Sequence, residues 1–426
     1  MPDVRSSYTD AVHFFDSVPP RELTHRFGSV LYVYNENILR RSCRALLEVS
    51  SHPGFRVNYS AKANSNPALL RIIREEGCLV DAMSPGELHN DILAGFAPHD
   101  ILYVCNNVSA DELRNAADHK VLVSVDSLSQ LNLYGQVNPG GRVMIRINPG
   151  VGAGYHQKVV TGGKDTKFGI DPYTMNEVQA ILNNHNLTLA GINQHIGSLF
   201  MEPDDYLSAV DIMLHFTAAL PDALRAQLDI IDFGGGFGIP YHKYEDQERL
   251  NLARLGQGLH RRLEDFSAQT GYRGRFFVEP GRYLIAECGL LLGTVHVIKK
   301  NGATRYAGTD LGFNVLMRPI LYDAFHDIEI YREGGVPDVR LVPQTIVGNI
   351  CESGDILAKD RLLPELQEGD VIGILDAGAY GLAMASTYNQ RPRPAEVLLT
   401  ADGRARLIRR RETLEDMNLC FACEES

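Results

Sequence analysis

The stretch FRVNYSAKANSNPALLRIIREEGCLVDAM, residues 55–83, holds the pattern that decides the fold. Its first part, FRVNYSA (55–61), and its last part, CLVDAM (78–83), are short apolar runs typical of buried strands. Between them, NPALLRIIREEG (66–77) places apolar residues at three- and four-residue spacing and ends in glycine, which is typical of a helix. A helix between two strands predicts that the strands lie parallel in one sheet.

The same alternation of strand and helix continues to about residue 285. A second helical pattern, SPGELHNDILAGF (84–96), follows the second strand. Six more strand-like runs bring the total to eight, and they are ILYVC (101–105), VLVSVD (121–126), RVMIRIN (142–148), LAGINQHIG (189–197), LDIIDFGG (228–235) and RFFVEPG (275–281). Eight such units predict an α/β fold with a closed (β/α)8 barrel of the TIM type. A doubly wound open sheet has the same alternation and is the alternative architecture.

The pattern changes after residue 286, where helical patterns become scarce. Strand-like runs continue, and they are LLLGTVHVIKK (290–300), DIEIYRE (327–333), QTIVGNI (344–350), DVIGILDAG (370–378) and AEVLLT (395–400). They predict a C-terminal β domain of sandwich or barrel type. SVLYVYN (29–35) is another strand-like run, and we expect it to join this β domain. The predicted domains are an N-terminal segment (1–36), a barrel (37–285) and a β domain (286–426).

The composition is that of a globular enzyme-sized chain rather than a nucleic-acid or membrane protein. The formal net charge of −12 argues against a general nucleic-acid binder, which needs a basic face. The sequence shows neither a signal-peptide pattern at its start nor an apolar run of about 18 residues. The seven cysteines are scattered, which favours a reduced, cytoplasmic protein. Cys420 and Cys423 form a single CxxC without a second ligand pair, so we expect no metal site.

Polar residues gather where the predicted strands end. In a (β/α)8 barrel the active site forms at the C-terminal ends of the strands. The polar and glycine residues at these ends are Lys62, Asp81, Arg146, His195, Ser198, Glu279, Gly281 and Arg282. Each alone could be an ordinary structural residue, and a histidine at a strand end is more often a hydrogen-bonded core residue than a catalyst. Their convergence on one face predicts an active site.

The glycine-rich run GGGFG (234–238) follows the seventh predicted strand. Glycines leave backbone N–H groups open to an anion, and phosphate sites near the seventh and eighth strands are common in barrels. The run does not match GxGxxG, because Ile239 follows it, and no GK[ST] follows either. Taken alone, a tight strand-to-helix turn explains the run as well as a phosphate site does.

A lysine and a phosphate loop at one end of a barrel suggest a Schiff base to pyridoxal 5'-phosphate. Glu279 is the candidate partner of the pyridine nitrogen. A carboxylate there keeps the nitrogen protonated and suits decarboxylation, whereas an arginine suits milder chemistry such as racemisation. His195 is placed to stack on the ring, and Ser198 and Gly236 to hold the phosphate.

The predicted β domain adds further candidates. Cys351, in CESGD (351–355), carries a thiol that could donate a proton to a carbanion, although it could also be part of a simple strand end. LMRPILYDAF (316–325) offers Arg318 and Tyr322, and a guanidinium there could grip a carboxylate through two N–H groups.

Taken together, these motifs resemble one enzyme family. They are YSAKAN (59–64), GEL (86–88), TKFGI (166–170), HIGS (195–198), GGGFGIPY (234–241), EPGR (279–282), RPILY (318–322), CESGD (351–355), DAGAYG (376–381) and YNQRPRPAEVL (388–398). The chain resembles the pyridoxal-phosphate decarboxylases of the alanine-racemase-like barrel fold, most closely the branch that acts on meso-diaminopimelate. The resemblance covers residues 35 to 400.

The resemblance implies a role for each matching position. Lys62 is expected to bind the cofactor covalently. The other cofactor residues implied are Asp81, His195, Ser198, Gly236, Glu279, Gly281, Arg282 and Tyr380. The substrate residues implied are Arg282, Arg318, Tyr322, Glu352 and Tyr380. Cys351 is expected to protonate the carbanion, with Lys62 and His195 as the other catalytic residues.

The family also implies an assembly and a moving loop. Cys351 and Glu352 reach the active site of the neighbouring subunit in the family, which implies a homodimer with shared sites. The loop GYHQKVVTGGKDTKFG (154–169) resembles a lid over the substrate.

The predicted reaction is the decarboxylation of meso-2,6-diaminopimelate to L-lysine and carbon dioxide, a step of lysine biosynthesis. Arg318 favours a distal carboxylate and would repel the distal ammonium of ornithine. The alternatives are a related decarboxylase acting on ornithine, lysine, arginine or carboxynorspermidine, an amino-acid racemase, and a non-catalytic relative that binds a partner protein. Glu279 counts against the racemase, and the presence of every expected catalytic residue counts against the non-catalytic relative.

Overall fold

A computed structural model describes residues 7–16, 18–148, 150, 153–154, 167–336 and 340–421. The chain forms two compact units. The barrel unit comprises Arg40–Ile239 and Glu248–Leu284. The β unit comprises Met1–Leu39, Pro240–Gln247 and Ile285–Ser426.

The barrel unit contains the predicted closed barrel of eight parallel strands. The order around the barrel is β10-β11-β2-β3-β4-β5-β6-β8. The strands are β2 (Phe55–Ser60), β3 (Leu79–Ala82), β4 (Ile101–Val104), β5 (Leu122–Val125), β6 (Arg142–Arg146), β8 (Thr188–Asn193), β10 (Ile230–Asp232) and β11 (Arg275–Val278). Each lies within or overlaps one of the eight predicted runs. The barrel prediction is therefore confirmed, and the open-sheet alternative is excluded because β11 pairs with β2 and closes the ring.

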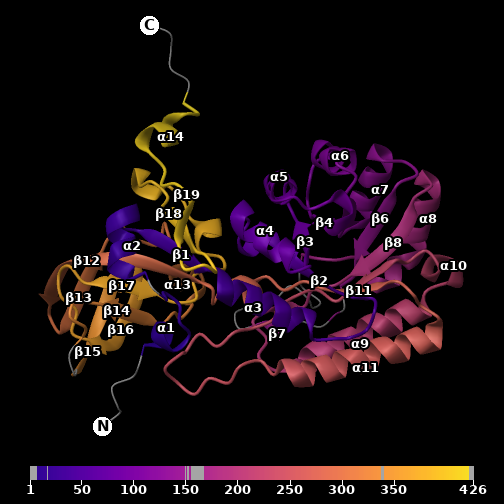
Figure 1. Cartoon of the computed structure of the whole chain (residues 1–426). Coiled ribbons are helices and arrows are strands. Elements are labelled where there is room, and N and C mark those ends of the chain that lie inside the picture. The colour runs from indigo at the N-terminus through magenta and orange to yellow at the C-terminus, as the bar shows by residue number, and fades with distance from the viewer. Residues whose placement is uncertain are drawn as a thin grey trace, which may run out of the picture. The chain divides into compact units, whose positions relative to one another are not determined.

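Helices cover the outside of the barrel. They are α3 (Glu36–Leu47), α4 (Pro67–Glu75), α5 (Pro85–Ala94), α6 (Ala110–Asp118), α7 (Leu128–Val137), α8 (Met175–His185), α9 (Pro203–Ala219), α10 (Asp222–Arg225) and α11 (Leu252–Thr270). In Figure 1, α5, α6, α7 and α8 follow one another around the strands. Local sequence sets the helix starts: the side chains of Asn66, Ser84, Ser109 and Ser127 each cap a helix by accepting a backbone N–H of its first turn.

The interior of the barrel is filled by apolar side chains. Leu102, Met144, Ile230 and Phe277, from four different strands, form one buried cluster. Because this apolar cluster fills the barrel interior, the polar groups at the strand ends lie at one rim and do not line a channel.

The β unit is built on a nine-stranded mixed sheet. Its main path runs β16-β15-β13-β12-β1-β18-β19, with β14 and β17 paired beside β12. The strands are β1 (Leu31–Asn35), β12 (Gly289–Asn301), β13 (Thr304–Thr309), β14 (Ile328–Tyr331), β15 (Leu341–Val347), β16 (Ile356–Pro364), β17 (Val371–Ile374), β18 (Ala395–Leu399) and β19 (Ala405–Arg409). Its helices are α1 (Tyr8–Ala11), α2 (Pro20–Phe27), α13 (Arg318–Tyr322) and α14 (Leu414–Asn418).

The N-terminal segment joins this sheet, as expected. β1 lies between β12, with which it is antiparallel, and β18, with which it is parallel. Every residue of β1 is buried, which explains why SVLYVYN is apolar. The prediction that the β domain takes in the N-terminal segment is confirmed.

The unit boundaries differ from the predicted domains at one internal segment. Pro240–Gln247 follows the glycine-rich run between two barrel strands, yet it belongs to the β unit. Lys243 holds it there, because its Nζ lies 2.6 Å from Glu287 Oε1 and 3.2 Å from Asp376 Oδ1. No local motif predicts that this segment joins the β unit, because the ion pairs connect residues far apart in the chain. Among the helices that the structure describes, none is long and apolar enough to cross a membrane.

Candidate active site

Lys62 lies at the end of β2, in the short 3-10 turn η1 (Ala61–Ala63). Asp81, at the end of neighbouring β3, fixes this turn with both carboxylate oxygens. Its Oδ2 accepts a hydrogen bond from Ser60 Oγ at 2.8 Å, and its Oδ1 accepts one from the Ala61 N–H at 3.1 Å. Asp81 therefore holds the backbone that presents the lysine.

Carboxyl groups surround the lysine amine. Lys62 acts electrostatically on Asp81, Glu87 and Glu279, and it lowers the pKa of each. Burial works in the opposite direction and dominates, so the pKa of Asp81 and that of Glu279 are both raised well above the ordinary values. The charge of Lys62 thus offsets only part of the effect of burial on these carboxyl groups.

Glu279, at the end of β11, pairs with Asp232, at the end of β10. Both carboxyls are buried and lie within hydrogen-bonding range of each other. Such a pair must hold a proton, because two adjacent buried carboxylates cannot both be ionised. Burial raises the pKa of Asp232 to about 7, and the Gly234 N–H fixes its Oδ1 at 2.9 Å.

His195 follows β8 and is held as a neutral ring. The Gly235 N–H donates to His195 Nδ1 at 3.1 Å, so this nitrogen is an acceptor and the ring proton sits on Nε2. Burial lowers the pKa of His195 well below its usual range, and the charges of Lys62 and Arg146 lower it further. A neutral imidazole presents a flat face suited to stacking on an aromatic ring.

The glycine-rich run forms a close-packed turn beside these residues. A Cβ on Gly235 would lie 1.8 Å from the Glu279 carbonyl oxygen, and one on Gly236 would lie 2.5 Å from the Gly197 carbonyl oxygen. Only glycine fits at these two positions. Arg282 Nη2 donates to Ser198 Oγ at 3.1 Å, which joins the ends of β11 and β9 (Gly197–Ser198). Gly281 directly precedes Arg282, the first residue of α12 (Arg282–Ile285).

These features fit pyridoxal phosphate. Apart from the proton that the pair shares, no donor among the described residues reaches the buried Glu279 Oε1 and Asp232 Oδ2. A protonated ring nitrogen would supply the missing donor, the imidazole of His195 would face the ring, and Ser198, Gly236 and Arg282 would hold the phosphate. Lys62 supplies the amine that an aldehyde requires.

A closed barrel with this set of strand-end residues defines the class of barrel enzymes that use pyridoxal phosphate. Residues 36–286 match the family model for the pyridoxal-dependent decarboxylases, over the pyridoxal binding domain. The chain belongs to this pyridoxal-dependent decarboxylase family.

Relatives with more specific names match nearly the whole chain. Diaminopimelate decarboxylase of Methanothermobacter thermautotrophicus is 40% identical over 93% of this chain and 92% of its own length. The structure of diaminopimelate decarboxylase from M. jannaschii in co-complex with L-lysine is 31% identical, covers 95% of this chain and 94% of that one, and has a TM-score of 0.86. The Helicobacter pylori enzyme complexed with L-lysine is 32% identical, covers 94% of this chain and 98% of that one, and has a TM-score of 0.85.

The other predicted site residues lie in the β unit. Cys351 is an exposed free thiol whose backbone N–H donates to Asn389 Oδ1 at 2.8 Å. The Tyr388 hydroxyl donates a hydrogen bond to Glu352 Oε1. Arg318 and Tyr322 are the first and last residues of α13, and Tyr380 has a positive φ of 56°. The barrel unit therefore brings together the predicted cofactor residues except Tyr380, and the β unit carries Tyr380, Cys351 and most predicted substrate residues. The predicted lid, 154–169, and the Cys420–Cys423 pair both extend outside the described residues.

Two members of this buried group were not among the predicted site residues. Asp232 and Glu87 stand at strand ends or just after them, which is the only signal that the sequence offered. Asp232 was quoted only as the first letter of the glycine-rich motif, and its pairing with Glu279 appears only in three dimensions. Arg146, at the end of β6, was noted at a strand end but given no role, and its charge acts on both Glu279 and Asp232.

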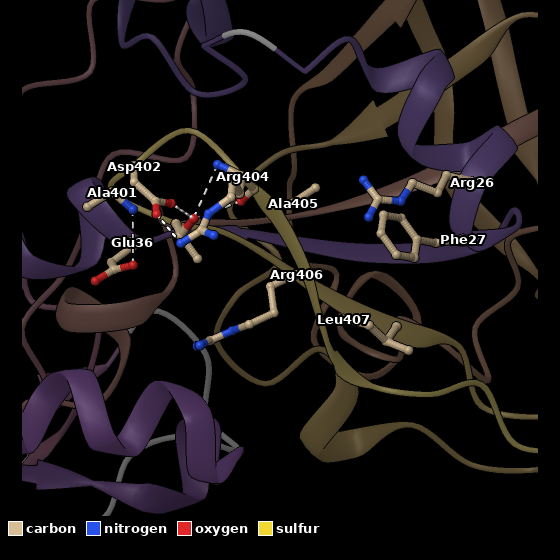
Figure 2. A pocket seen from close by; sticks show the side chains of 10 residues that line it. Arg26, Phe27, Glu36, Ala401, Asp402, Arg404, Ala405, Arg406 and Leu407 are labelled. Atoms are coloured by element: carbon tan, nitrogen blue, oxygen red, sulfur yellow. Dashed lines mark hydrogen bonds and ion pairs between the residues drawn. The ribbon is translucent and has the colours of Figure 1, made fainter.

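A separate surface hollow of about 700 Å³ lies in the β unit and contains none of these residues. Its lining includes Arg26, Phe27, Arg406 and Leu407 (Figure 2). Across it, Glu36 Oε2 accepts a hydrogen bond from the Ala401 N–H at 3.1 Å.

Asp91, on α5, is a further buried carboxyl of the barrel unit. Its side chain is 0% exposed, and neither of its oxygens has a hydrogen-bond partner among the described residues. Burial raises its pKa to about 9, and Asp81 and Glu87 add to the effect. The folded chain therefore keeps Asp91 protonated at neutral pH, whereas an unfolded chain ionises it above about pH 4. Its contribution to stability is full below that pH and is lost as the pH rises towards 9.

Replacing Asp91 by asparagine should remove this pH dependence. We expect the free energy of unfolding of Asp91→Asn, relative to the parent chain, to shift in the variant's favour by about 2.7 kcal/mol between pH 6 and pH 8. Urea denaturation at both pH values and one protein concentration measures the shift. Asp111→Asn, at an exposed position, is the control. A difference that stays constant with pH would contradict a protonated Asp91.

Proposed function

We propose that this chain decarboxylates meso-2,6-diaminopimelate to L-lysine and carbon dioxide with pyridoxal phosphate as cofactor. The observation that carries the proposal is a strand-end lysine, Lys62, whose charge acts on the buried Glu279 carboxyl in a pyridoxal-dependent decarboxylase barrel. The 40% identity to a diaminopimelate decarboxylase over almost the full length supports the substrate.

When bound, pyridoxal phosphate supplies the electron sink that accepts the electron pair left by the departing carboxylate. Lys62 Nζ would bind the cofactor at its aldehyde and could carry a proton at the same atom. Glu279 and Asp232 would hold a proton for the ring nitrogen, and His195 would lie against the ring. Ser198, Gly236, Gly281 and Arg282 would bind the phosphate, and the family resemblance assigns Tyr380 to it as well. Asp81 keeps the Lys62 turn in place.

The substrate residues select for a distal amino-acid group. Arg318 grips the distal carboxylate, because a guanidinium matches a carboxylate through two parallel N–H groups. Glu352 pairs with the distal ammonium, and Tyr322, Arg282 and Tyr380 complete the site. This set disfavours ornithine and lysine as substrates, because each would place its one carboxylate at the reacting carbon and leave none for Arg318. The barrel (37–285) carries most of the cofactor residues, and the β domain (286–426, joined by 1–36) carries most of the substrate residues. The enzyme acts in the cytoplasm.

Cys351 delivers the proton that replaces the carboxylate. We expect Cys351→Ala to lower kcat roughly 10²-fold, since a positioned general acid contributes at least that much. Cofactor affinity, followed by absorbance, should not change. Steady-state carbon dioxide release measures the effect, and Cys420→Ala, at another exposed thiol, is the control. Unchanged turnover in Cys351→Ala would mean that another group is the acid.

The working assembly is a homodimer in which Cys351 and Glu352 serve the neighbouring subunit. Mixing Lys62→Ala chains with Cys351→Ala chains tests this arrangement. A mixed dimer would contain one site with both residues intact, so an equal mixture should regain about a quarter of the parent activity. Activity no higher than that of the separate variants would contradict shared sites.

A further inference from the structure

We propose that His326 is a positioning residue that holds the Arg318 guanidinium in the orientation needed to bind the distal carboxylate. The inference rests on the proposed function, because it assigns Arg318 to that carboxylate. His326 follows the LMRPILYDAF motif directly and was not among the predicted site residues.

The hydrogen bonds of His326 fix which ring nitrogen carries the proton. His326 Nδ1 lies 2.7 Å from the Leu375 carbonyl oxygen, which can only accept a hydrogen bond. His326 Nε2 lies 2.7 Å from Arg318 Nη1, and a guanidinium can only donate. The ring must therefore donate from Nδ1 to Leu375 and accept at Nε2 from Arg318. This arrangement requires a neutral imidazole with its proton on Nδ1.

The surroundings leave this pair little freedom. The Arg318 side chain is 1% exposed and that of His326 is 3% exposed. Tyr241 contacts both: the Arg318 Cζ lies 4.8 Å from the centre of its ring, and the His326 ring meets it edge-on at 5.3 Å. The Arg361 Nη1 also donates to the His326 carbonyl oxygen at 3.0 Å, which anchors the backbone.

The geometry gives the guanidinium a fixed plane. Tyr241 lies against one face, and His326 takes one N–H at an edge. A grip on a carboxylate uses two N–H groups that lie side by side in that plane, so its alignment depends on the plane being held. Without the acceptor at Nε2, the guanidinium can rotate, and the alignment with a carboxylate is lost.

Two conservative replacements separate positioning from folding. The side-chain amide of glutamine reaches about as far as Nε2, so His326→Gln keeps an acceptor for Arg318. Asparagine reaches about as far as Nδ1, so His326→Asn keeps the donor to Leu375 and loses that acceptor. We expect His326→Asn to raise the KM for meso-diaminopimelate roughly 10-fold with a much smaller change in kcat. His326→Gln should have a KM close to that of the parent chain.

Two ligands that differ only in the distal carboxylate sharpen the test. L-Lysine, as the product, keeps the carboxylate that was distal in the substrate, and cadaverine lacks it. Titrated into the cofactor-loaded protein, L-lysine should bind His326→Asn roughly 10-fold more weakly, whereas cadaverine should change by less than about twofold. Equal weakening of both ligands, an unchanged L-lysine affinity, or no recovery in His326→Gln would overturn the inference.

A measurement on the parent chain needs no variant. Neutron diffraction should show deuterium on His326 Nδ1 and none on Nε2, and deuterium on Nε2 would overturn the assignment even if His326→Asn failed to fold. Failure of the proposed function looks different: the parent chain would then release no carbon dioxide from meso-diaminopimelate. A parent chain that is active, together with a His326→Asn variant that binds L-lysine normally, would remove this inference alone.

Discussion

Lys62→Ala is expected to abolish decarboxylation and the absorbance of the lysine-bound cofactor. Lys62 carries the amine at the end of β2, and its charge lowers the pKa of Asp81, Glu87, Glu279 and His195. Alanine leaves no group that can bind the aldehyde carbon or carry a proton there. Losing a covalent catalytic group of this kind costs roughly 10³-fold or more in rate. Visible absorbance and carbon dioxide release measure the two effects.

The control for this variant is Lys299→Ala, at an exposed lysine on β12, which should keep full activity and colour. The fold of Lys62→Ala should survive, because the hydrogen bonds from Ser60 Oγ and the Ala61 N–H to Asp81 remain in the variant. A small primary amine added to the variant should restore part of the turnover. A yellow, active Lys62→Ala protein would contradict the mechanism.

Glu279→Gln is expected to lower kcat roughly 10²- to 10³-fold, the range seen when one preorganised electrostatic group is removed from an active site. The amide has nearly the same shape but no negative charge, so it cannot hold a proton on the ring nitrogen. It also breaks the carboxyl pair with Asp232, whose buried Oδ2 has no other partner among the described residues.

Two readouts follow the Glu279 variant. The first is kcat for carbon dioxide release, and the second is the dissociation constant of the cofactor, which should rise because the ring loses a charged partner. Glu177→Gln, at an exposed position on α8, is the matched control. A Glu279→Gln enzyme with the parent kcat would show that the ring nitrogen is not protonated by this residue, and it would reopen the racemase alternative.

Local sequence patterns predicted all the strands of the barrel but only some of the strands of the β unit. All eight barrel strands appeared as short apolar runs because each is buried between its neighbours and the helices. The strands β13, β16 and β19 were missed. β13 (TRYAGT) is only half-buried, β16 carries charged residues such as Lys359 and Asp360, and β19 is an edge strand with exposed Arg406 and Leu407. Strands with a solvated face lack the continuous apolar run that marked the others.

The residues of the candidate site also differ in how far local sequence predicts them. Lys62, His195 and Glu279 could be proposed from the sequence because a barrel places strand ends at one rim. Asp232 and His326 could not, because the contacts that single them out form only in the folded chain. The pKa shifts that mark Glu279 and Asp232 arise from burial, which no short motif encodes. The roles of Arg318, Tyr322, Cys351 and Glu352 stay predictions that the variants above test.

The most direct test of the central claim is product formation by the purified chain supplied with pyridoxal phosphate and meso-2,6-diaminopimelate. Chromatographic detection of L-lysine, together with carbon dioxide release, measures it. We expect one L-lysine and one carbon dioxide for each substrate molecule consumed, with ornithine and L-lysine turned over far more slowly. Carbon dioxide release from ornithine at a higher kcat/KM than from meso-diaminopimelate, or no L-lysine at all, would contradict it.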